Sequence, residues 1–153
     1  MKQQRVFFIA VGLWLACCVS LTAQELGFWR AANSTAESVT GDVAFSDARI
    51  SINFASFAIV HARDLEPAEV SSVFDADSNA STKGHLYKVD IPAAKKFMHK
   101  KTLCGTEDAQ WMVTYVEGRS LQLAFISGAK APVFTLDAIS NSSNLCGTYT
   151  YAR

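Results

Sequence analysis

The chain has 153 residues, half of them hydrophobic, and its 14 Lys and Arg balance 14 Asp and Glu. A net charge of zero supplies no positive field that would steer the protein to nucleic acid, so we expect no nucleic-acid partner. The length suits one domain that buries a core of its own.

The first 23 residues have the layout of a secretory signal. Lys2 and Arg5 give a positive start, residues 6–16 form an apolar stretch, and small residues lie near Ala23. That stretch is too short to anchor the chain in a membrane, and no later stretch approaches the roughly 18 apolar residues of a span. We therefore expect a signal peptide over 1–23 and a single β-rich domain over 24–153, secreted or periplasmic and without a transmembrane segment.

Leu15-Ala16-Cys17-Cys18 offers an alternative destination, because it resembles a bacterial lipobox, in which a cysteine is acylated. With Cys17 as the acceptor, Trp14 stands where that motif usually has Leu. With Cys18, a cysteine stands where Gly, Ala or Ser is usual. Lipid anchoring at either cysteine is the alternative to free export.

Two cysteines remain after the expected signal, and both lie in the tetrapeptide Leu-Cys-Gly-Thr, at 103–106 and 145–148. In an oxidising compartment, two cysteines without a third predict one disulfide, Cys104–Cys146. We expect Gly105 and Gly147 to adopt a positive φ that bends each strand toward the sulfur of the other.

Alternation of apolar and polar residues predicts mostly short strands. Residues 67–74 are expected to form a short helix with Pro67 in its first turn, and 93–101 has a composition compatible with a second helix. The fold class is thus mainly β: a single small antiparallel barrel or sandwich of about eight strands, with one or two short helices and one disulfide. A closed barrel is favoured because it leaves no exposed edge. The expected strands lie at 27–31, 43–45, 50–54, 57–63, 86–91, 111–116, 121–126, 133–136 and 146–152.

The densest charge lies in one short segment between two expected strands. Its basic residues are Lys95, Lys96, His99, Lys100 and Lys101. This segment predicts a binding surface for an anionic partner such as phospholipid headgroups or cell-envelope polysaccharide. The alternative is an ordinary solvated face.

Asp75, Asp77 and Asn79 place side-chain oxygens at alternate positions, like the first half of a calcium loop. Ala80 stands where that loop needs a glycine, and Leu86 where it needs a bidentate Glu. A polar turn explains these residues better than a metal site, so we expect no metal.

The three histidines, His61, His85 and His99, have no spacing typical of metal ligands, and each is expected to be a surface or hydrogen-bonded residue instead of a ligand. No nucleophile elbow, zinc-protease motif, phosphate loop or dinucleotide fingerprint occurs. We therefore expect no catalytic residues, no cofactor and no enzymatic activity. A hydrolase would need a Ser, a His and a carboxylate that converge from distant positions.

The cysteine motifs, together with Trp111 and the run 123–128, resemble a group of small secreted bacterial proteins without assigned function. The similarity covers about the last fifty residues and brings no catalytic residues. Gly27-Phe28-Trp29 and Arg153 resemble lipocalins. That resemblance implies a Trp that closes one end of a barrel, with a basic side chain packed across it. In general form the chain is also similar to periplasmic inhibitors of lysozyme, although their inhibitory loop motifs are absent.

These observations predict an exported, non-enzymatic binding domain whose ligand is an unknown protein, polysaccharide or small molecule of the cell envelope. The alternatives are a lipocalin-like carrier of a small apolar ligand and an inhibitor of a cell-wall hydrolase. An interior filled by Phe45, Phe54, Trp111 and Phe125 would exclude the carrier.

Overall fold

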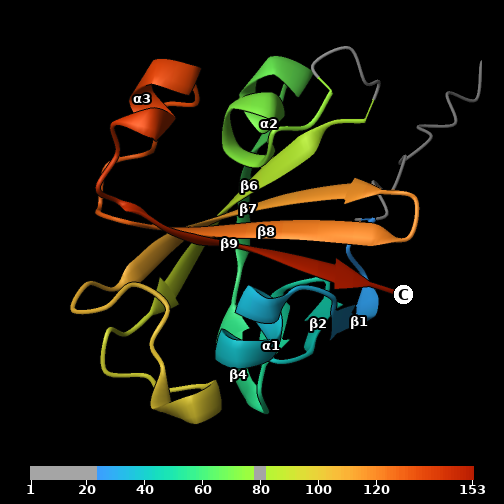
Figure 1. Ribbon diagram of the computed structural model, residues 1–153, viewed down its shortest axis with the longest axis vertical. Coiled ribbons are helices and arrows are strands. Elements are labelled where there is room, and N and C mark those ends of the chain that lie inside the picture. The colour runs from blue at the N-terminus through green and yellow to red at the C-terminus, as the bar shows by residue number, and fades with distance from the viewer. Residues whose placement is uncertain (1–23, 78–81) are drawn as a thin grey trace, which may run out of the picture.

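Nine antiparallel strands form one sheet in the computed structural model, which describes residues 24–77 and 82–153 (Figure 1). The expected signal peptide, with Cys17 and Cys18, and the calcium-loop candidate Asn79 lie outside the described residues. The strands are β1 (Gly27–Ala31), β2 (Val43–Ser46), β3 (Arg49–Ile52), β4 (Ala55–Ala58), β5 (Val60–Leu65), β6 (Gly84–Ile91), β7 (Ala109–Glu117), β8 (Ser120–Ser127) and β9 (Leu145–Ala152). The helices are α1 (Ser34–Val39), α2 (Pro67–Phe74), α3 (Leu136–Ser140) and a 3-10 helix, η1 (Met98–Lys100).

The strand order is β4-β3-β2-β1-β9-β8-β7-β6-β5, so the two edge strands are consecutive in the chain. β4 ends at Ala58 and β5 begins at Val60, and only the buried Ile59 separates them. No ladder joins β4 to β5 within the described residues, so the expected complete closure is wrong and the sheet is a sandwich or an open barrel. The mainly β fold class is confirmed, with three short α-helices instead of one or two.

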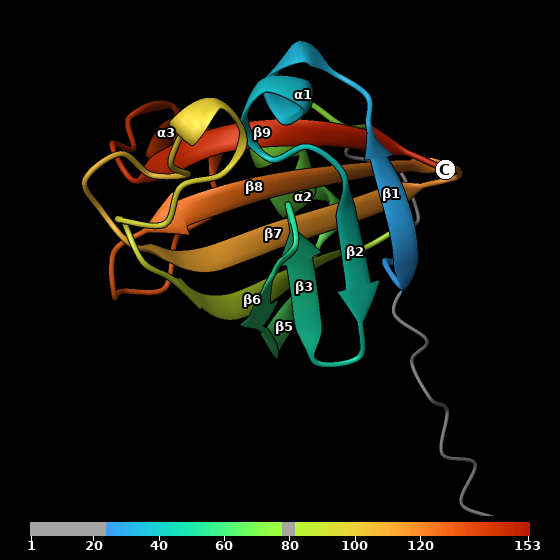
Figure 2. The same cartoon turned by 90° about the horizontal axis from the view of Figure 1, so that it is seen from below.

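The strands β6 to β9 form the middle of three layers. Figure 1 shows α2 and α3 on one side of these strands, and α1 with β1 to β4 on the other. In Figure 2, β1 to β3 cross in front of β7 and β8. Successive side chains on a strand point to opposite faces. Met112 therefore packs in the core facing β1 to β4, which we call the inner core, and Val113 in the outer core beneath the two helices.

Large aromatic side chains occupy the inner core. Phe45 and Phe125 lie there as expected. Trp111 does not, because its position on β7 faces the outer core. The expectation that Phe54 lies in the interior is also wrong. β3 ends at Ile52, and Phe54 lies at the tip of the β3–β4 turn, where it is fully exposed and has a φ of +67°. The other large aromatic residues of the inner core are Trp29, Tyr87, Phe97, Tyr149 and Tyr151.

Two further expectations about local structure are wrong. The segment 93–101 forms turns and η1 instead of a helix, which is consistent with the repulsion between like charges four apart, such as Lys96 and Lys100, in a helix. The segment 133–136 does not form a strand. Thr135 caps α3 instead, because its hydroxyl oxygen accepts the backbone N–H of Ala138 at 3.2 Å. The helix expected at 67–74 is confirmed as α2.

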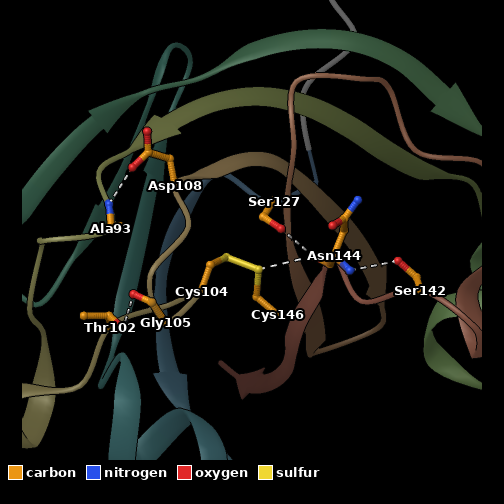
Figure 3. Close-up of a disulfide and its surroundings, with 9 residues drawn as sticks. All are labelled: Ala93, Thr102, Cys104, Gly105, Asp108, Ser127, Ser142, Asn144 and Cys146. Carbon is orange, nitrogen blue, oxygen red and sulfur yellow. Dashed lines mark hydrogen bonds between the residues drawn. A yellow bond between two sulfur atoms is a disulfide. The ribbon is translucent and has the colours of Figure 1, made fainter.

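The disulfide between Cys104 and Cys146 ties the β6–β7 loop to the start of β9 (Figure 3). Gly105 has the expected positive φ of +64°. The expectation for Gly147 is wrong, because it lies inside β9 with ordinary strand geometry. A Cβ there would lie 3.2 Å from the Tyr149 hydroxyl, so glycine leaves room for that side chain.

No helix within residues 24–77 and 82–153 is both long and apolar enough to cross a membrane.

Candidate functional site

Strands β5 and β6 bring two histidines and an aspartate to one place at the edge of the sheet. Asp64 lies directly opposite His85 in the register of the two strands, and His61 lies opposite Tyr87. A bulge between His61 and Arg63 adds one residue to β5. Because a bulge reverses the alternation of side chains, His61 and Asp64 point to the same side although they are three residues apart.

The potential ligand atoms of these three side chains lie within 4.8 Å of one another. The His61 Nε2 atom is 2.9 Å from Asp64 Oδ1, and His85 Nε2 is 3.7 Å from the same oxygen. The rings of His61 and His85 meet edge to face at a centroid distance of 5.5 Å. We call His61, Asp64 and His85 the histidine cluster.

A buried carboxylate supports the cluster from the interior. Glu25 lies just before β1 and is 1% exposed. Its Oε1 atom is 2.6 Å from His85 Nδ1, and it also accepts a hydrogen bond from the Thr114 hydroxyl. Its Oε2 atom is buried and has no hydrogen-bond partner among the described residues. His85 is therefore the only described cationic group in contact with the Glu25 charge.

The two partners shift each other's pKa values. Burial raises the pKa of Glu25, but the hydrogen bonds from His85 and Thr114 outweigh burial and the net shift is downward. The hydrogen bond to Glu25 raises the pKa of His85, and burial opposes it in part. Since an ionised carboxylate can only accept hydrogen bonds, His85 Nδ1 must be the donor. This arrangement leaves His85 Nε2 directed toward Asp64.

Two imidazoles and one carboxylate form a ligand set that binds zinc and related divalent metals. Tetrahedral zinc with bonds of about 2.0–2.1 Å places neighbouring ligand atoms about 3.3 Å apart. The separations of the two histidine nitrogens from Asp64 Oδ1, 2.9 and 3.7 Å, bracket that value, and all the ligand atoms lie within 4.8 Å of one another. The side chains of His61 and Asp64 are 48% and 40% exposed, so binding of an ion would need rotation of exposed groups only at these two residues. Three protein ligands leave one coordination position open.

The order of contacts does not match a hydrolytic triad. In a triad the histidine lies between the hydroxyl and the carboxylate. Here Glu25 lies between Thr114 and His85, so His85 cannot take a proton from this hydroxyl. Thr114 is also fully buried.

The expected basic binding residues all lie on the surface of the β6–β7 loop and η1. The buried Phe97 and Leu103 attach this loop to the inner core. His99 Nδ1 lies 3.1 Å from the Ser38 carbonyl oxygen. Within the described residues no lysine of this loop forms an ion pair, so the positive charges face solvent. We call Lys95, Lys96, His99, Lys100 and Lys101 the basic loop.

The other candidate metal residues are not brought together in the described part of the chain. Asp75 forms the left-handed cap of α2 with a φ of +53°. Asp77 is exposed. The histidine cluster shares no residue with this segment.

As expected, each histidine is exposed or hydrogen-bonded, but the sequence pattern does not indicate that His61 and His85 lie together. One signal could have located His85: it lies two residues before Tyr87 on an alternating strand, so it shares the inward face of Tyr87. No pattern marks the bulge that turns His61 toward Asp64. Glu25 lies next to the expected cleavage point, where an unstructured end is the usual expectation.

Comparisons with known proteins returned no matching family model, no significantly similar curated protein and no significantly similar solved structure.

Proposed function

We propose that the protein is an exported β-domain that binds one divalent transition metal ion of the zinc class through His61, Asp64 and His85. The observation that carries this proposal is the convergence of three ligand atoms within 4.8 Å, one of them on a histidine whose other nitrogen is bonded to a buried carboxylate. Histidines in metal sites commonly donate their second N–H to a carboxylate in this way.

Charge favours a cation at this position. The cluster contains the carboxylate of Asp64, and the buried carboxylate of Glu25 contacts it through His85. A divalent ion bound to His85 Nε2 would displace a proton from that nitrogen and compensate the same charge. The proposal concerns binding of the ion and assigns it no catalytic step.

Isothermal titration with Zn²⁺, and the visible spectrum of the Co²⁺ form, test this proposal on the purified protein. We expect one ion per chain. His85→Ala or His61→Ala should weaken binding by more than the roughly 10–100-fold typical of losing a supporting residue, because each removes a ligand. Bound metal should also raise the melting temperature of the wild-type protein.

His99→Ala is the matched control, because it removes an exposed histidine outside the cluster. Its metal affinity should equal that of the wild type. Equal losses in the His85→Ala and His99→Ala variants, or no binding by the wild type, would reject the metal site and leave the cluster as a stabilising ion-pair network.

The basic loop supports a second candidate function, the docking of an anionic partner such as phospholipid headgroups or cell-envelope polysaccharide. The observation that favours it is the exposure of five basic residues, of which the four lysines have no ion pair within the described residues. Interactions of this kind are screened over about 8 Å at 0.15 M salt. Binding through this loop should therefore be lost as the ionic strength rises.

A further inference from the structure

The residues before β1 are fixed by their backbone. Arg153 donates from Nη1 to the Leu26 carbonyl at 2.7 Å and from Nη2 to the Gln24 carbonyl at 3.2 Å. Trp29 Nε1 donates to the Glu25 carbonyl at 2.7 Å. Three consecutive carbonyls are thus bonded by two side chains. We call Gln24–Leu26 the strap.

The two side chains that hold the strap also hold each other. The Arg153 guanidinium carbon lies 4.1 Å from the centre of the Trp29 ring, which is the geometry of a cation–π contact. Trp29 is fully buried, so its position is set by the inner core. Arg153, which follows β9, and Trp29 on β1 therefore determine where the strap lies.

With its backbone fixed in this way, Glu25 directs its side chain onto the paired strands β6 and β7. It reaches Thr114 on β7 and His85 on β6. These contacts orient the His85 ring, since Nδ1 is bonded to Glu25 and Nε2 is left on the side of Asp64. A ring that is already oriented loses less rotational freedom when it binds an ion.

We infer that the strap controls the metal affinity of the histidine cluster, with Glu25 as the positioning residue for His85 and with Arg153 and Trp29 as the groups that keep the strap in place. This inference rests on the proposed metal function. A cluster with a released strap would keep its three ligands but lose the carboxylate that orients one of them. Residues outside the first coordination sphere, including the last residue of the chain, would then set how tightly the ion is bound.

Glu25→Gln tests the inference most directly, because it keeps the shape of the side chain and removes its charge. We expect the Kd for Zn²⁺ to rise about 10–100-fold, as for other residues that support a metal ligand. We also expect the pKa of His85, measured by NMR without metal, to fall toward its ordinary value. That fall would show that the Glu25 carboxylate contacts His85 in solution, which the positioning role requires. Glu25→Asp should restore part of both properties.

Arg153→Gln provides a second variant that leaves Glu25 in the sequence. It removes the donors to Gln24 and Leu26, so the Kd should rise in the same direction but by a smaller factor. Glu107→Gln is the matched control for the loss of a carboxylate, since Glu107 is exposed in the β6–β7 loop. It should leave the Kd unchanged. Circular dichroism shows whether each variant is folded.

The outcomes separate this inference from the proposed function. If the wild type binds Zn²⁺ and folded Glu25→Gln and Arg153→Gln variants bind it equally well, the strap has no control over the site and only the inference fails. If the wild type binds no metal, the proposed function fails and the inference fails with it. A weakened Kd with an unchanged pKa of His85 would also overturn the positioning role.

Discussion

The histidine cluster together with Glu25 contains four titratable side chains and the basic loop contains five, but the two regions arrange them differently. Glu25, the β5 residues His61 and Asp64, and His85 come from three separate parts of the chain and converge on hydrogen bonds and ion pairs. In the basic loop, four lysines and one histidine lie within seven residues, and all five are exposed. A dense run of charged residues in the sequence therefore need not form a site of defined geometry. Titratable residues that are far apart in the sequence can converge to form one.

The difference has an energetic origin. A buried charge is costly unless a partner compensates it, so Glu25 requires His85 and Thr114. Exposed lysines are compensated by water and need no partner. Specific geometry is therefore expected at the cluster, and adjustable, salt-sensitive contact at the basic loop.

Breaking the disulfide should have the largest effect on stability. It should also show whether the histidine cluster is independent of the loop that carries the basic residues. A Cys104→Ser/Cys146→Ser variant is expected to lose about 2–4 kcal/mol of unfolding free energy, because the unfolded chain is no longer constrained. The loss can be measured by urea denaturation. The bond ties the base of the β6–β7 loop to β9, so metal affinity at the cluster should change by less than about twofold. A tenfold change would show that the two regions are coupled.

The response to pH should show a smaller effect that belongs to the cluster alone. The raised pKa of His85 contributes stability below its ordinary value of 6.5, and this contribution is lost as the pH rises through the folded-state pKa. The lowered pKa of Glu25 contributes stability above 4.5, which is lost as the pH falls through the folded-state pKa. The metal-free protein should therefore be most stable between these values and lose about 1 kcal/mol toward alkaline pH.

Thermal unfolding between pH 5 and 9 measures this profile. The charged and titratable groups that face His85 are Glu25, Asp64, His61 and Tyr87, so the Glu25→Gln variant should flatten the profile. The stabilisation given by Zn²⁺ should run the other way and grow as the pH rises, because protons compete for His85. A metal-free profile that is identical in the wild type and in Glu25→Gln would contradict the ion pair.

Neutralising the basic loop should have the smallest effect on stability. Changing Lys95, Lys96, Lys100 and Lys101 to Gln is expected to alter the unfolding free energy by less than about 0.5 kcal/mol, because all four are exposed. The same variant should lose binding to vesicles that contain anionic phospholipid, measured by sedimentation at low salt. Lys130→Gln, a change at an exposed lysine outside the loop, is the control. Unchanged vesicle binding by the fourfold variant would leave the loop as a solvated face.

Properties that depend on local pattern could be predicted from the sequence. Alternation located the strands at 111–116 and 121–126 that pair as β7 and β8, and two leftover cysteines predicted the bridge. Alternation failed at Phe54, where a two-residue turn with positive φ at Asn53 and Phe54 ends the strand. A turn of this kind favours Asn at its first position, so Asn53 was the available signal.

The candidate site depends on features that no local pattern encodes. The bulge after His61 changes the face of Asp64, and the register of β5 on β6 decides which histidine lies opposite it. The strap depends on Arg153, which lies 128 residues away from Glu25 in the chain, so only the folded arrangement shows that the two are connected.

The short connection between β4 and β5 also bears on how far the edges of the sheet are open to a second copy of the chain. Free strand edges are templates on which another copy can add its own strand. Because Ile59 alone separates the two outermost strands, both free edges lie next to each other and each is short, at four and six residues. A longer linker at this position would let the sheet unroll, and it would expose two separate edges to domain swapping or fibril growth.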